Sequence, residues 1–226
     1  MSLGGKLVFI RKKKIKMKSP WLLAAVLVVC AGLIGWLTRP PEQVTAAKEK
    51  ESRRHPAPPA DLQTVNQQIG QSIANATLET MSAQAVPLGS LLQGKPMVLV
   101  FFSHDCDCSL EFARYFVTAM QASQTKADWH FVFPDTPEQI STFTSKAGLS
   151  LPSLRDPGAE LSRKLGVTKS GPFVLVDPQG VVIAIWPGVS LTGLEDLFSR
   201  LKLPPLSASQ LSGIPQSPTA GCPLHP

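Results

Sequence analysis

A run of apolar residues in the middle of the chain constrains the fold most. Residues Met97–Ser103 (MVLVFFS) are aliphatic or aromatic up to the final serine and carry no charge. A continuous run of this kind is typical of a strand that is buried on both faces. It therefore predicts an α/β fold, in which helices cover both sides of a central sheet.

The segments after this run alternate between helical and extended patterns. Thr136 is a plausible N-cap with Gln139 three residues later, Gly148 ends that helix, and residues 177–180 (DPQG) form a hairpin turn. The predicted helices are Ser109–Ala122, Pro137–Ala147 and Leu191–Leu203, and the further strands are Trp129–Phe133, Phe173–Val176 and Val181–Trp186. This order predicts a three-layer sandwich with a mixed sheet.

The net charge of +6 is confined to the N-terminus. The first 19 residues carry seven Lys or Arg and no acid, so the rest of the chain has a net charge of −1, which argues against a nucleic-acid partner. Trp21–Leu37 then gives 17 uncharged apolar residues with Trp21 and Trp36 at its ends. These features predict a single transmembrane helix with a cytoplasmic N-terminus. A cleaved signal peptide, a lipoprotein signal at Cys30 and a buried core helix are the alternatives.

The predicted organisation has five parts. Proline and mixed charge mark a linker before the folded domain, and six prolines with Ser and Gly mark the C-terminal end as disordered. The parts are a basic cytoplasmic tail at 1–19, a transmembrane helix at 20–38, a linker at 39–76, the folded domain at 77–203 and a disordered tail at 204–226. We expect a protein of the bacterial inner membrane whose domain lies in the periplasm.

Two of the four cysteines stand where a strand runs into a helix. Cys106 and Cys108 follow the apolar strand and open the helix. Unpaired N–H groups and the helix dipole favour a thiolate at such a position, whereas the charges of Asp105 and Asp107 oppose it. The junction therefore predicts a reactive cysteine whose net pKa shift the sequence leaves open.

Two separated blocks of sequence resemble the thioredoxin superfamily, and within it the membrane-tethered TlpA/ResA-like redoxins. They are 94–96 (GKP) with the following strand and Cys106, and 156–158 (DPG), 165–167 (LGV) and 171–180 (GPFVLVDPQG). The resemblance covers about residues 88–203 and implies a thioredoxin-like fold. It implies thiol–disulfide exchange with protein substrates and a membrane or periplasmic redox partner, without a cofactor. It also implies that Pro172 follows a cis peptide bond, faces Cys106 and shapes the edge that binds substrate.

The cysteine motif departs from the family pattern. Ser109 stands at the second-cysteine position, Cys108 lies one place earlier, and Val100 stands where thioredoxin has a buried Asp. If Cys106 is the attacking thiol and Cys108 resolves, their disulfide closes a small, strained ring that is easily reduced. Without that bridge, Cys106 with Ser109 forms a Cys-x-x-Ser site that releases mixed disulfides slowly, as an isomerase or a trapping adaptor does. In either case Ser109 is expected to cap the helix and hydrogen-bond the thiolate.

Other functions of these residues remain open at this stage. His104, Cys106 and Cys108 offer one nitrogen and two sulfurs to Cu(I) or Zn(II), as in a metal chaperone. A redox-inactive adaptor, a structural disulfide and inert thiols are further readings. The peroxiredoxin pattern Pro-x-x-x-Thr-x-x-Cys is absent. Cys222 could fold back onto Cys106, but a bystander thiol in a disordered tail is the favoured interpretation.

Overall fold

The computed structural model describes residues 55–57 and 59–224. These residues belong to one compact unit, Glu49–Pro226. The predicted basic tail, the transmembrane helix and the linker up to residue 54 lie outside the described residues. Within the described ranges, no helix combines the length and the apolar character that crossing a membrane requires.

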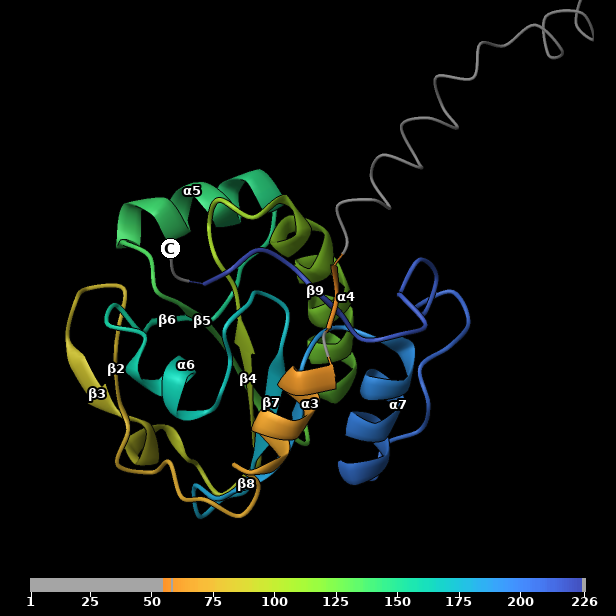
Figure 1. Ribbon diagram of the computed structural model, residues 1–226, viewed down its shortest axis with the longest axis horizontal. Helices are drawn as coiled ribbons and strands as arrows, with labels where there is room; N and C mark the ends of the chain where they lie inside the picture. Colours follow the sequence, from red (N-terminus) through yellow and green to blue (C-terminus); the bar gives the residue numbers. More distant parts are fainter. Residues whose placement is uncertain (1–54, 58, 225–226) are drawn as a thin grey trace, which may run out of the picture. The chain divides into compact units, whose positions relative to one another are not determined.

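A seven-stranded sheet forms the centre of the domain (Figure 1). β4 is parallel to β5 and antiparallel to β7, so the sheet is mixed, as predicted. Its order is β3-β2-β6-β5-β4-β7-β8, with the strands Ala85–Pro87 (β3), Thr77–Glu79 (β2), Ser153–Arg155 (β6), Asp128–Phe133 (β5), Met97–Phe101 (β4), Phe173–Val176 (β7) and Val182–Trp186 (β8). The short strands β2, β3 and β6 are additions to the predicted set.

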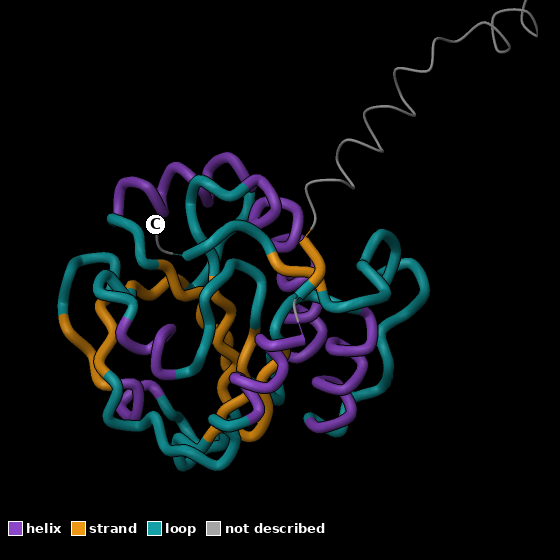
Figure 2. Tube along the Cα trace, in the orientation of Figure 1, coloured by secondary structure: helices purple, strands orange, loops and turns teal. Residues whose placement is uncertain are grey.

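Helices cover both faces of this sheet (Figure 2). One face packs against α4 (Asp107–Ser123), α5 (Pro137–Ala147) and α7 (Leu191–Arg200), and the other against α3 (Pro59–Asn66), the 3-10 turn η1 (Leu88–Leu91) and α6 (Glu160–Lys164). Successive side chains of β4 alternate between the two cores: Val98 and Val100 face the first, and Leu99 and Phe101 the second. The three-layer prediction is therefore confirmed.

Several local signals form as the sequence predicts. Thr136 and Gln139 make a reciprocal capping box at the start of α5, and Gly148 ends this helix in the left-handed conformation, with φ of 64°. In the β7–β8 turn, the Asp177 carboxylate accepts hydrogen bonds from the backbone of Gln179 and Val181, both at 2.8 Å. These short-range contacts fix the turn between β7 and β8 and the two ends of α5.

The predicted start of the domain at residue 77 is wrong, because the preceding segment is part of the core. Val65 on α3 and Ile73 are 1% and 0% exposed. Backbone hydrogen bonds join Gly70 to Val182 and Ile73 to Gly180, at 2.9 and 2.8 Å. The composition of this segment is polar and Gln-rich, but two buried apolar residues, Val65 and Ile73, attach it to the core.

The predicted disorder of the C-terminal tail is also wrong. Residues 204–224 are described and packed, and β9 (Thr219–Ala220) pairs with β1 (His55–Pro56), drawn in orange beside it in Figure 1. Its buried apolar side chains are Leu206, Ile214, Ala220 and Leu224. Prolines prevent a regular helix or inner strand here, but widely spaced apolar residues and backbone hydrogen bonds still fix the segment.

Candidate active site

Cys106 occupies the turn between the central strand and the helix that follows it. It is the N-cap of α4 in an extended conformation, with φ of −95° and ψ of 109°, and is 1% exposed. Its carbonyl accepts the backbone N–H of Ser109 at 2.9 Å, which begins the helix. The sulfur therefore lies at the positive end of a 17-residue helix, as the sequence predicts.

Three free cysteines meet at this point: Cys106, Cys108 and Cys222. The backbone N–H of Cys222 donates a hydrogen bond to the Cys106 sulfur at 3.1 Å, although 116 positions separate the two residues. The thiols of Cys108 and Cys222 also hydrogen-bond this sulfur. The structure thus corrects the bystander interpretation of Cys222, which depended on the tail being disordered.

The three thiols differ sharply in acidity. The hydrogen bond from Cys108 is the largest influence on Cys106 and, with those from Cys222, lowers the pKa of Cys106 to about 4 against the opposing effect of burial. The same bond to Cys106 raises the pKa of Cys108, and burial followed by the bond to Cys106 raises that of Cys222 to about 12. Asp105 acts on Cys222, whose pKa it raises. The site therefore holds one thiolate, on Cys106, and two thiols that donate to it.

Two buried serine hydroxyls lie at the same site. The Oγ atoms of Ser109 and Ser170 have no hydrogen-bond partner among the described residues, and both side chains are fully buried. The expected cap from Ser109 is therefore not formed. The Ser109 hydroxyl still lies near enough to Cys106 to contribute to the lowering of its pKa, as the last of several causes.

Pro172 differs in one respect from what the resemblance implies. The described residues contain no cis peptide bond, so the expected cis bond before Pro172 is absent. Gly171, with φ of 101°, turns the chain at this point instead. Backbone hydrogen bonds join Gly171 and Pro172 to Phe101 at 2.8 and 3.1 Å, which brings the start of β7 to the end of β4.

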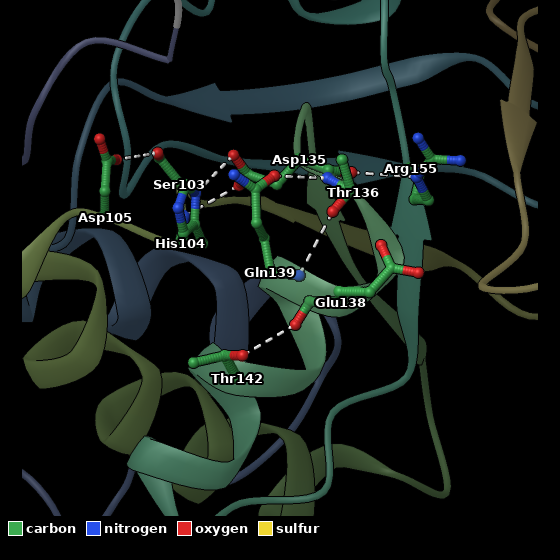
Figure 3. Close-up of polar contacts among 9 residues, drawn as sticks. All are labelled: Ser103, His104, Asp105, Asp135, Thr136, Glu138, Gln139, Thr142 and Arg155. Atoms are coloured by element: carbon green, nitrogen blue, oxygen red, sulfur yellow. Dashed lines mark hydrogen bonds and ion pairs between the residues drawn. The ribbon is translucent and has the colours of Figure 1, made fainter.

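His104 is held by the carboxylate of Asp135 (Figure 3). Its backbone N–H and its ring Nδ1 lie 2.8 Å from the two carboxylate oxygens of Asp135, and Arg155 Nε donates to the Asp135 carbonyl at 2.9 Å. The part of the chain that the structure describes contains no group of three His, Cys, Asp or Glu side chains arranged to bind a metal ion. The predicted set of His104, Cys106 and Cys108 is thus not assembled as a metal site.

A cavity of about 530 Å³ opens beside the thiols. Its lining consists of Ser103, His104, Asp105, Asp135, Cys222, Pro223 and Leu224. Ser103 donates to the Asp105 carboxylate at 2.5 Å, which fixes one wall. Cys222 lines this cavity whereas Cys106 does not, so the C-terminal segment stands between the cavity and the thiolate.

The sequence model of the AhpC/TSA family matches residues 69–185, which is more than half of the chain. The chain belongs to the AhpC/TSA family. The match begins before β2 and ends within β8, so it includes β4, α4 and Cys106 but not α7 or the C-terminal segment. The thioredoxin-like fold that the resemblance implies is thereby confirmed for this AhpC/TSA protein.

Solved structures of redox proteins are similar to this AhpC/TSA chain. MTB DsbF is 24% identical, with 58% of this chain and 96% of that chain covered and a TM-score of 0.47. A secreted Mycobacterium tuberculosis disulfide oxidoreductase is 21% identical over 57% and 96%, with a TM-score of 0.46. Xanthomonas campestris peroxiredoxin Q is 19% identical over 57% and 91%, with a TM-score of 0.47. No curated protein matches the chain.

Proposed function

We propose that this AhpC/TSA protein exchanges thiols and disulfides with protein substrates, with Cys106 as the attacking nucleophile. The observation that carries the proposal is the single thiolate at the start of α4, stabilised by hydrogen bonds from two neighbouring thiols. The thiolate is the form that attacks a disulfide, and a positively polarised helix end favours it. Membership of a redoxin family supports the same chemistry.

The reaction has two displacement steps. The Cys106 thiolate attacks one sulfur of the substrate disulfide, forms a mixed disulfide and releases the other substrate sulfur as a thiolate, which takes up a proton. The Cys108 thiol, after losing its proton, attacks the Cys106 sulfur and releases the second substrate thiolate. The substrate gains two electrons, and the protein is left with a Cys106–Cys108 disulfide. In the reverse direction the same steps oxidise a substrate dithiol.

The place of action forms part of the proposal. We assign the protein to the TlpA/ResA-like branch, tethered to the bacterial inner membrane with its domain in the periplasm. The support is the basic segment at 1–19, the apolar stretch at 20–38 and the two sequence blocks that resemble this branch. The substrates are then periplasmic protein thiols, and a membrane or periplasmic partner restores the active redox state. A protease-protection experiment that found residues 60–226 in the cytoplasm would overturn this topology.

The decisive experiment compares two serine variants of the full chain in detergent. Cys106→Ser should abolish both the reduction of insulin disulfides and the formation of a mixed disulfide. Cys108→Ser should keep the first step and stop at the mixed disulfide, which a non-reducing gel detects as a covalent adduct. The same protein should consume hydrogen peroxide much more slowly than it reduces the disulfide. Insulin reduction that survives Cys106→Ser refutes the assignment, and faster turnover of peroxide would replace it with peroxidase activity.

A further inference from the structure

The C-terminal segment forms an extra strand along the chain just before Pro172. The Ser170 N–H donates to the Cys222 carbonyl at 2.9 Å, and the Gly221 N–H donates to the Ser170 carbonyl at 2.7 Å. Further along, the Leu224 N–H donates to the Thr168 carbonyl at 2.9 Å. This is the antiparallel pattern by which an extended peptide adds to an exposed edge.

This added strand presents a cysteine to the nucleophile. The Cys222 N–H is bonded to the Cys106 sulfur, and its thiol hydrogen-bonds the same atom. A substrate cysteine must reach this position for its sulfur to be attacked. Cys222 therefore stands where the cysteine of a bound substrate would stand.

The fit at the preceding residue is tight. A Cβ atom on Gly221 would lie 2.8 Å from the Cys106 sulfur and 3.2 Å from the Cβ atoms of Cys108 and Ser170. The 2.8 Å contact is shorter than packed atoms allow, the two at 3.2 Å are tight, and the residues on three sides are buried. Glycine is therefore the residue that fits without displacing the Cys106 sulfur immediately before a cysteine that is bound in this way.

Apolar side chains on either side of the cysteine anchor the strand. Ala220 and Leu224, two residues before and two after Cys222, are 0% and 5% exposed. Leu224 joins the core formed by the α6 side of the sheet, where Leu161 and Leu165 also pack. The segment thus combines a backbone ladder with a small residue, a cysteine and an apolar anchor at fixed spacing.

We propose that residues 219–224 are a built-in substrate mimic. Residues 221–224 of the mimic lie along Thr168–Ser170, the edge on which a polypeptide substrate docks in an extended conformation, and residues 219–220 lead into them from β9. The substrate class is a segment with glycine directly before its reactive cysteine and an apolar residue two positions after it. This inference rests on the proposed function and adds to it the substrate class and a built-in competitor.

The mimic imposes an order on the reaction. A substrate segment first displaces residues 219–224 from the edge, and the Cys106 thiolate then attacks the substrate disulfide as described above. Cys108 remains next to Cys106 throughout because it lies on α4, so it still resolves the mixed disulfide while Cys222 is displaced. The reaction consumes no electrons beyond those of Cys106 and Cys108.

The test uses peptides as the substrate and the full chain as the protein. The octapeptide SPTAGCPL, which copies residues 217–224, carries thionitrobenzoate on its cysteine, and the release of this chromophore reports attack by Cys106. A second peptide has alanine in place of the glycine. We expect the glycine peptide to react at least about tenfold faster, since about 1.4 kcal/mol of steric penalty gives this factor. Equal rates for the two peptides would overturn the proposal.

Two protein variants should then weaken the binding of the mimic over Cys106. Leu224→Ala removes an anchor, and Gly221→Ala introduces the Cβ that clashes with the Cys106 sulfur, so both should raise the rate with the glycine peptide several-fold. The matched controls are Leu206→Ala, also buried in the C-terminal segment but on the other core, and Gly158→Ala, whose added Cβ meets only ordinary contacts. Both controls should react at the wild-type rate.

The outcomes separate this inference from the proposed function. Wild-type rates in both variants, with near-ultraviolet circular dichroism showing intact folding, would refute the mimic while leaving Cys106 as the nucleophile. If either variant unfolds, the unreactive peptide SPTAGSPL added to wild-type protein is the alternative probe, and it should slow the reaction of the glycine peptide. Absence of such competition would equally refute the mimic. A protein whose Cys106 reacts with neither peptide nor any small disulfide would refute the proposed function itself.

Discussion

Replacing Cys108 by alanine should change the ionisation of Cys106 more than any other single substitution around the site. The Cys108 thiol supplies the largest of the effects that lower the pKa of Cys106, ahead of those from Cys222 and Ser109. Burial acts in the opposite direction and remains in the variant, since α4 and the C-terminal segment still cover the sulfur. The pKa of Cys106 should therefore rise steeply in Cys108→Ala, and by less in Cys222→Ala, which keeps the backbone N–H donor.

The pKa of Cys106 in the protein and the pKa of an ordinary thiol set the limits of the change that the substitution can cause. With a pKa of about 4, Cys106 is almost entirely thiolate at about pH 7, whereas an ordinary thiol with a pKa of 9.0 is about 1% ionised there. Because the pKa is lowered, the thiolate persists as the pH falls and disappears only as the pH approaches 4. Cys108→Ala should move this titration upward, toward the neutral range, and reduce the thiolate present under physiological conditions.

Thiolate absorbance in the ultraviolet measures this directly and does not require a reagent to reach the buried sulfur. The protein is titrated with acid, and the curve of a Cys106→Ser variant is subtracted, so that only the signal of Cys106 remains. The pH at the midpoint of the titration should be lowest in the wild type, higher in Cys222→Ala and highest in Cys108→Ala. Identical midpoints for wild type and Cys108→Ala would refute the reasoning, because they would show that helix and backbone effects alone hold the thiolate.

Three further substitutions test how the site is supported, each by urea denaturation. Phe102→Ala should lower the free energy of unfolding by about 3–5 kcal/mol, because this ring is fully buried among four other aromatic rings. Asp135→Ala should cost about 1–3 kcal/mol, since it removes both acceptors of His104. Asp156→Ala should cost a similar amount, roughly 1–3 kcal/mol, because the buried carboxylate accepts from the backbone and hydroxyl of Ser162 at the start of α6.

Matched controls keep these predictions specific. Ile69→Ala removes an apolar side chain that is 46% exposed, so it should change stability far less than Phe102→Ala. Asp196→Ala breaks an exposed ion pair with Arg200 and should cost less than about 1 kcal/mol. A loss as large as that of Asp135→Ala or Asp156→Ala in the Asp196 variant would contradict the distinction between buried and exposed carboxylates.

The regular elements of the fold could be predicted because their signals are local. The strand at Met97–Phe101, the helix at Pro137–Ala147 and the hairpin turn at 177–180 each follow from apolar runs, a capping box or turn residues. β2, β3 and β6 have only three residues each, which is too short for a periodic pattern. Their pairing depends on contacts between distant segments, such as Glu79 opposite Arg155.

The candidate site also has one part that local sequence predicts and another that depends on distant contacts. The reactive position of Cys106 could be predicted because its strand and helix adjoin it in the sequence. The role of Cys222 could not, since the Pro-rich composition of its segment resembles disorder and its partners at 168–170 are far away along the chain. The sign of the pKa shift at Cys106 was likewise inaccessible, because it depends on sulfur–sulfur hydrogen bonds that only the folded chain creates.

The pairing of β1 with β9 joins the first and last described segments of the domain. His55 and Pro56 lie opposite Ala220 and Thr219, and the Ala57 N–H donates to the Pro218 carbonyl at 3.0 Å. The first and last described segments therefore share one two-stranded ribbon, which continues directly into the residues over Cys106. Tension applied to the chain at residue 55 would therefore act on this ribbon and, through it, on Gly221 and Cys222.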